Sequence, residues 1–200
     1  MSNQVLPLVA LAVSIVALAL SLVATVAQRR RANMEIARAL HIDLTSGVVA
    51  DARKPLGELA FAVRSEWEAD RVSPDLEKAL RESSAEAADL RHHYFVLLWC
   101  FERVWNGYQV IWADRRVVGV RPSQELANML GWHVRNWSHD LPAIKMALET
   151  HLGEIHDGDS ARAFAALGDA VLTDADIRKI RRRLGEMGLE PIGEPAWSAG

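Results

Sequence analysis

The pattern of apolar and polar positions divides the chain sharply after residue 27. Residues 5–27 form an unbroken run without a charged side chain. As a helix with a rise of about 1.5 Å per residue, the run covers about 34 Å, and the hydrocarbon core of a bilayer is roughly 30 Å thick. A single segment inside lipid satisfies all its backbone hydrogen bonds only as a helix. The run therefore predicts a transmembrane helix over residues 5–27, preceded by a short N-terminus of residues 1–4.

A cleaved signal peptide is the alternative interpretation of this run. Signal peptides have a basic leader and an apolar stretch of about 7–15 residues. Here residues 1–4 contain no Lys or Arg and the apolar stretch is longer, although residues 25–27 would make an acceptable cleavage site before Gln28. Residues 29–31 are all arginine, and basic residues that flank a span stay in the cytoplasm. We expect an uncleaved single-pass anchor in the plasma membrane, with residues 1–4 outside the cell and the C-terminal domain in the cytoplasm.

Small residues repeat along one face of the predicted span at alternating spacings of four and three. Small side chains let membrane helices approach closely. The face therefore predicts a homodimer through the transmembrane helix, against the alternative of chance in a segment rich in Ala and Ser. The members of this small-residue face are Ala10, Ser14, Ala17, Ser21 and Ala24.

Helical periodicity continues beyond the span. Apolar residues recur at four-residue steps within residues 28–54, which predicts a juxtamembrane helix or linker. Pro55 is expected to break this helix and to begin the next one, because proline is favoured in a first helical turn. We assign residues 55–187 to a cytoplasmic α-helical domain and expect residues 188–200, which hold several Pro and Gly, to be disordered.

The strongest apolar stripe of the domain covers residues 85–116, so this helix is expected at the centre of the core. Another helix is predicted over 124–137, and Asp140 is expected to cap the one that follows it. The fold class predicted is all-α, with one N-terminal transmembrane helix followed by a single soluble helical domain of about six to seven helices. The last of these helices, over 174–186, begins with a capping box of Thr173 and Asp176.

Composition narrows the function classes. The net charge of −3 over 200 residues argues against bulk nucleic-acid binding, because nucleic-acid-binding proteins usually have a basic excess. The single cysteine, Cys100, excludes an intrachain disulfide, in agreement with a reducing compartment. It lies in an apolar run, where a reactive thiolate is disfavoured. Most of the 23 basic residues are arginine, which suggests a GC-rich bacterial genome.

The spacing of the histidines does not fit a metal site on one helix. A metal-binding pair on a helix needs ligands three or four residues apart, but six residues separate His133 from His139 and five separate His151 from His156. The run that begins at Asp157 lacks the calcium-loop pattern and is interpreted as an N-cap turn. No nucleotide-binding or hydrolase motif is present in the sequence, so we predict no metal, no cofactor and no catalytic residues.

The apolar helix carries one acidic residue, Glu102, which is expected to be partly buried and to have a structural role. Tryptophan is heavily used, at seven residues, and most of the tryptophans are expected to fill a core built from rather few helices. As an alternative, the helices bearing Trp and His would line a ligand pocket on which Glu102, His93, His133 and His139 converge.

Two basic groups are candidates for contact with anionic lipid, one directly after the span and one on the last helix. The alternatives for the second group are a solvated helix end, and phosphates of nucleic acid. The candidate residues are Arg29, Arg30 and Arg31, and Arg178, Lys179, Arg181, Arg182 and Arg183.

The sequence thus favours a membrane-anchored protein with a cytoplasmic helical interaction or scaffold domain. Its expected partners are membrane lipid, an unknown protein and a second copy of the chain. The second hypothesis is a membrane-tethered enzyme or small-ligand sensor with a pocket lined by Trp, His and Glu.

Overall fold

The computed structural model describes residues 5–69 and 84–193, and the predicted N-terminus (1–4) and the last residues of the tail (194–200) lie outside them. The described residues are mostly helical and include no strand, which confirms the all-α fold class. They form seven helices: α1 (Val5–Thr45), α2 (Gly47–Ala69), α4 (Ser84–Ala113), α5 (Arg115–Val118), α6 (Arg121–Leu152), α7 (Gly158–Val171) and α8 (Asp174–Glu186).

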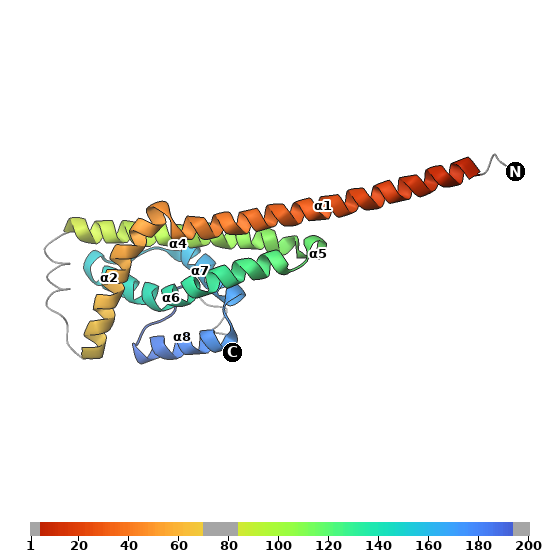
Figure 1. Cartoon of the computed structure of the whole chain (residues 1–200). Helices are drawn as coiled ribbons and strands as arrows, with labels where there is room; N and C mark the ends of the chain where they lie inside the picture. The colour runs from red at the N-terminus through yellow and green to blue at the C-terminus, as the bar shows by residue number, and fades with distance from the viewer. Residues whose placement is uncertain (1–4, 70–83, 194–200) are drawn as a thin grey trace.

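Helix α1 has two halves with different surroundings. Its first half projects alone from the molecule, and its second half lies along the bundle of the other helices (Figure 1). In the second half Asn33, Ala37 and Leu44 are buried in the core. Residues 28–54, expected to be a juxtamembrane helix or linker, thus contribute to the core of the domain.

The break after α1 lies at Gly47, and the prediction of a break at Pro55 is wrong. Gly47 has a φ of +56°, a left-handed conformation that other residues rarely adopt. Pro55 lies inside α2. Its neighbours Leu56 and Leu59 are buried, and this packing holds the helix together across the proline.

Helix α4 is the centre of the core, as its stripe predicts. It contacts α1, α2, α6 and α7, and Phe101 is fully buried against Phe164 of α7 with ring centroids 4.7 Å apart. At Gly107 the helix approaches α1 so closely that an added Cβ would lie 2.4 Å from Leu40. A glycine at this position therefore allows α1 and α4 to pack together.

Helix α6 is one continuous helix, so the prediction that Asp140 starts a new helix is wrong. Pro142 lies inside it, and Asp140 forms an ion pair with Arg64 of α2 at 2.8 Å instead of capping. The helix ends at Leu152 and is followed by Gly153, which has a φ of +78°.

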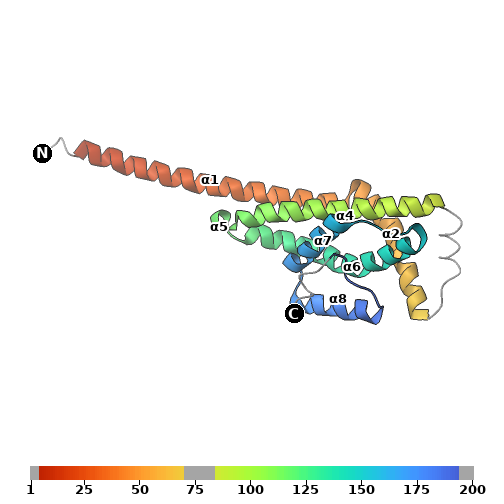
Figure 2. The same cartoon turned by 180° about the vertical axis from the view of Figure 1, so that it is seen from behind.

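Helix α8 confirms its predicted bounds and its capping box of Thr173 and Asp176. It lies against α6, on the side away from α1 (Figure 2). The expectation of disorder from residue 188 is wrong for residues 188–193. Ile192 is buried there, and Gly193 lies so close to α7 that an added Cβ would be 2.6 Å from the Ala161 carbonyl oxygen.

Candidate functional site at the membrane end of the domain

One helix in the described part of the chain is long and apolar enough to cross a membrane, and it is the projecting half of α1. Its large apolar side chains are exposed, with 66% exposure for Leu8 and 59% for Leu22. Along most of this half of α1 no other described helix lies beside it to cover them (Figure 1). Such a surface is unfavourable in water and suited to lipid. This finding supports membrane anchoring.

The domain begins almost directly after the apolar segment. Asn33, six residues past Ala27, is 4% exposed and donates a hydrogen bond to Asp114 at 3.2 Å. Six helical residues cover about 9 Å. Since α1 is continuous here, no flexible linker separates the apolar segment from the core.

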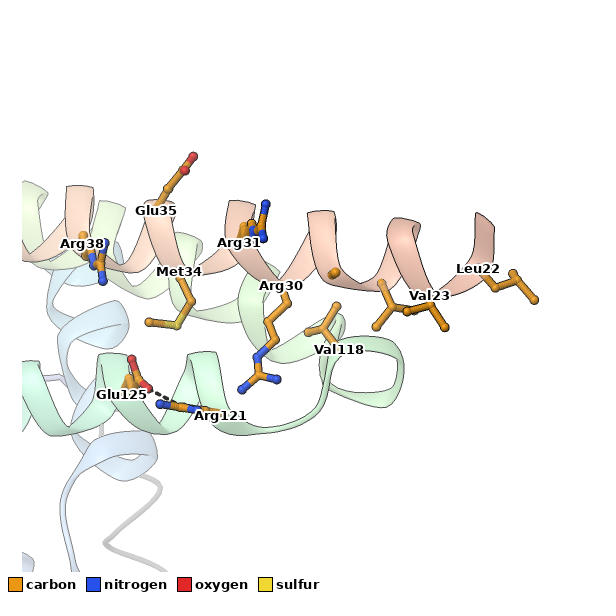
Figure 3. Close-up of a pocket in the computed structure, with 12 residues that line it drawn as sticks. Leu22, Val23, Arg30, Arg31, Met34, Glu35, Arg38, Val118, Arg121 and Glu125 are labelled. Carbon is orange, nitrogen blue, oxygen red and sulfur yellow. Dashed lines mark hydrogen bonds and ion pairs between the residues drawn. The ribbon is translucent and has the colours of Figure 1, made fainter. Parts of the chain in front are cut away.

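A groove of about 810 Å³ opens between α1 and the corner formed by α5 and α6 (Figure 3). Along α1 its wall changes from apolar to basic. The groove is lined on the α1 side by Leu22, Val23, Val26, Ala27, Arg30, Arg31, Met34, Glu35 and Arg38, and on the other side by Val118, Arg121 and Glu125.

The charged side chains of this groove are not equivalent. Arg30 reaches across from α1 toward α6, and Glu35 points away from the groove (Figure 3). Arg121 and Glu125 form an ion pair at 2.7 Å. Arg30 and Arg31 have no such partner among the described residues, so the groove retains a net positive charge.

The α5 corner next to this groove exposes apolar and aromatic side chains. Val117 and Val120 are 49% and 46% exposed. Trp112, at the end of α4, is 42% exposed, and the Arg115 guanidinium lies 4.2 Å from its ring centroid. Exposed Trp and Arg together are typical of the interface between lipid and water. The sequence analysis missed this corner, although the basic residues that bracket an apolar run over 115–121 are a signal that could have found it.

The structure does not bring the two predicted basic groups together. Arg29, Arg30 and Arg31 lie beside the groove on α1, whereas the basic residues of α8 lie beyond α6 and away from the α5 corner (Figure 1). Arg181 and Arg183 interact with neighbours within the domain. The small-residue face from Ala10 to Ala24 is exposed along the projecting half of α1.

Arg53 fixes the turn from α1 into α2. Its guanidinium donates to the carbonyl oxygen of Leu44 at 3.4 Å and to Nδ1 of His133 at 3.2 Å, and it lies 5.9 Å from the Trp137 ring centroid. A guanidinium can only donate, so Nδ1 of His133 is an unprotonated acceptor. Burial, and next the charge of Arg53, lower the pKa of His133 to about 4.

Acidification is therefore expected to destabilise the domain through His133. Its folded pKa of about 4 lies below the usual 6.5, so the unfolded state binds more protons between these values. The stability is complete above about pH 6.5 and is lost as the pH falls toward 4, by about 1–2 kcal/mol at pH 5. Chemical unfolding of the full chain in detergent at pH 7.5 and pH 5 measures this loss of stability. His133→Gln should show a smaller loss, and an equal loss would contradict this origin.

Asp157 stands at the N-cap position of α7, but its side chain does not cap, which corrects the interpretation as an N-cap turn. Its carboxylate accepts from the Tyr94 hydroxyl at 2.5 Å and from the Lys145 ammonium at 2.7 Å. Burial, and next the hydrogen bond to Asp157, raise the pKa of Tyr94 far above its usual range, so the hydroxyl remains a donor. The three side chains join α4, α6 and the loop before α7.

The pocket of the second hypothesis lacks the expected convergence. Glu102 is partly buried, as predicted, and accepts a hydrogen bond from Ser160 at 2.6 Å. His133 contacts Arg53, whereas the ring nitrogens Nδ1 of His93 and His139 are buried without a hydrogen-bond partner. These side chains have separate surroundings, and no group of three or more metal-ligating side chains occurs in the described ranges.

Most of the tryptophans whose side chains the structure describes do not fill the core as expected. Trp137 is 5% exposed, but Trp99, Trp112 and Trp132 are 52%, 42% and 58% exposed. Aliphatic residues together with Tyr94 and Phe101 occupy the centre in their place. Cys100 is buried, which raises the pKa of its thiol, as expected for an unreactive cysteine.

A second groove, of about 510 Å³, lies between the α1–α2 corner and α4 and has the exposed Trp99 and Val48 on its walls. Trp99 is held by its neighbour Phe95, with ring centroids 5.7 Å apart. This Trp99 groove and the groove beside α5 are two candidate binding surfaces on the described residues.

Comparison with known proteins adds no assignment to these surfaces, since no protein family model, no curated protein and no solved structure matches the chain.

Proposed function

We propose that the chain is a single-pass membrane protein, of bacterial origin, whose helical domain is an interaction or scaffold module on the cytoplasmic side of the plasma membrane. The uncharged first half of α1 and the arginines that follow it support this orientation. Because the same helix continues into the core at Asn33, the domain would be held at a fixed position against the membrane.

The observation that carries the interaction role is the Trp99 groove. An exposed Trp held in place by a second aromatic ring is a favourable anchor for a partner, since little side-chain entropy is lost on binding. Val48 on the opposite wall is 66% exposed, so an apolar partner would cover both side chains. The groove lies just past the end of α1 that is remote from the projecting half, where a partner in the cytoplasm could reach it.

Photo-cross-linking in native membranes tests this role. With a photoreactive residue at Val48, the full chain should form protein adducts, and Trp99→Ala should reduce their yield at least threefold. The matched control places the photoreactive residue at Gln109, which is exposed on α4 outside the groove. A chain that stays monomeric and forms no adduct at Val48 would contradict the interaction role.

Self-association through the small-residue face has its own test. Ala17→Cys should form a disulfide-linked dimer on mild oxidation in membranes, whereas Ala19→Cys, on the other side of the helix, should form much less. The buried Cys100, which is 1% exposed, gives little background. Equal cross-linking at both positions would argue against a dimer through this face.

A further inference from the structure

We propose that the groove between α1 and the α5–α6 corner binds one anionic phospholipid drawn from the bilayer. Its acyl chains would lie along Leu22, Val23 and Val26, and its phosphate between Arg30 and Arg121. The inference rests on the proposed membrane anchor and names a specific lipid partner for it.

The order of residues along α1 matches the polarity of such a ligand. Leu22 and Val23 belong to the predicted span and are 59% and 68% exposed, so they are accessible to acyl chains. Arg30 lies about two helical turns further on, where the headgroups begin if the span ends at Ala27. A phospholipid that follows α1 therefore meets apolar side chains with its tails and guanidinium groups with its phosphate.

The second wall makes the groove a site rather than a bare helix face. Val118 is 7% exposed and closes the apolar part from α5, and Arg121 at the start of α6 lies opposite Arg30 (Figure 3). Met34, which also lines the groove, points from α1 toward α6 (Figure 3). The exposed Val117 and Val120 place further apolar contacts at the same level.

The positive charge of the groove favours an anionic lipid headgroup. Four arginines and two glutamates line the groove, and one glutamate, Glu125, is already paired with Arg121. Glu35 points away from the space between the helices (Figure 3). Arginine binds phosphate through charge-assisted hydrogen bonds, so a phospholipid with net negative charge is favoured over a zwitterionic one. An acidic peptide would satisfy the arginines but would leave the apolar wall at the depth of the span uncovered.

Native mass spectrometry of the full chain, released from nanodiscs that contain equal phosphatidylglycerol and phosphatidylcholine with the same acyl chains, tests the proposal. Wild type should retain one phosphatidylglycerol. Arg30→Gln combined with Arg121→Gln should lower the retained fraction at least fivefold. Met34→Trp, which fills the groove and leaves every charge in place, should lower it as well. The matched control, Arg178→Gln with Arg182→Gln on α8, removes the same charge elsewhere and should change it less than twofold.

Three results would overturn the proposal. These are equal retention of both lipids by wild type, equal losses in the groove and α8 variants, or displacement of the lipid by millimolar glycerol phosphate, which would indicate a water-soluble ligand. Carbonate extraction of the membranes from which the chain is purified distinguishes failure of the membrane anchor from failure of the groove proposal. Extraction of wild type into the soluble fraction would overturn the anchor itself, whereas wild type that stays in the membrane without lipid preference overturns the groove proposal alone.

Discussion

Replacing Asp157 with alanine is expected to destabilise the domain by about 2–3 kcal/mol, which lowers the melting temperature by roughly 5–10 °C for a domain of this size. The change leaves the fully buried Tyr94 hydroxyl without an acceptor and separates Lys145 from its closest carboxylate. A buried polar group that loses its partner costs its full desolvation penalty. We expect less than the largest values known for buried pairs, because the Lys145 side chain is 27% exposed and Glu149 remains 3.9 Å away.

Thermal unfolding of the full chain in detergent, followed by circular dichroism, measures this loss. Two control variants separate the contributions of the two contacts to this loss of stability. Asp157→Asn keeps an acceptor for Tyr94 but removes the charge that faces Lys145, and Tyr94→Phe removes the hydroxyl alone. Each should cost about 1 kcal/mol. A melting temperature within 2 °C of wild type for Asp157→Ala would contradict the structural role assigned to these contacts.

An arginine at the middle of the projecting half of α1 should prevent membrane anchoring. Val16 lies at the centre of residues 5–27, where an arginine costs about 2.5–3.5 kcal/mol in membrane insertion. We expect Val16→Arg to shift most of the chain from the carbonate-resistant membrane fraction to the soluble or aggregated fraction. Val16→Ala is the matched control and should remain in the membrane.

Intact mass measured on the same samples addresses the signal-peptide alternative. Wild type from the membrane fraction should have the mass of the whole chain. A mature form that begins at Gln28 would show that the apolar segment is removed, and membrane retention of Val16→Arg equal to wild type would show that insertion of this segment does not hold the chain there.

Local patterns in the sequence were sufficient for most of the helices. The stripe predicted over 85–116 corresponds to α4, and the capping box of Thr173 and Asp176 is formed as predicted. Both features depend on residues a few positions apart, whose interactions are the same in any helical context. Gly47 and Pro55 were both possible positions for a helix break, and local sequence could not choose between them. Packing decides: the helix breaks at Gly47, and buried neighbours of Pro55 keep α2 continuous there.

The groove beside α5 could not be predicted in this way. Its walls come from α1 and from the α5–α6 corner, which are eighty or more positions apart, and nothing in either segment alone indicates that Val26 lies near Val118. The exposure of the tryptophans could not be predicted for the same reason. Trp99 is of a residue type that often lies in a core, but the direction in which its side chain points depends on where α1 and α2 pack against α4.

Membrane depth of three labelled positions tests the central claim, that α1 spans the bilayer and holds the α5 corner at its surface. Spin labels at Ala17→Cys, Val120→Cys and Arg182→Cys, in full chain reconstituted into liposomes, would be compared by their accessibility to oxygen and to a water-soluble nickel complex. We predict the Ala17 label deep in the hydrocarbon, the Val120 label at the headgroups and the Arg182 label in water. A label at Ala17 as accessible to nickel as that at Arg182 would contradict the claim.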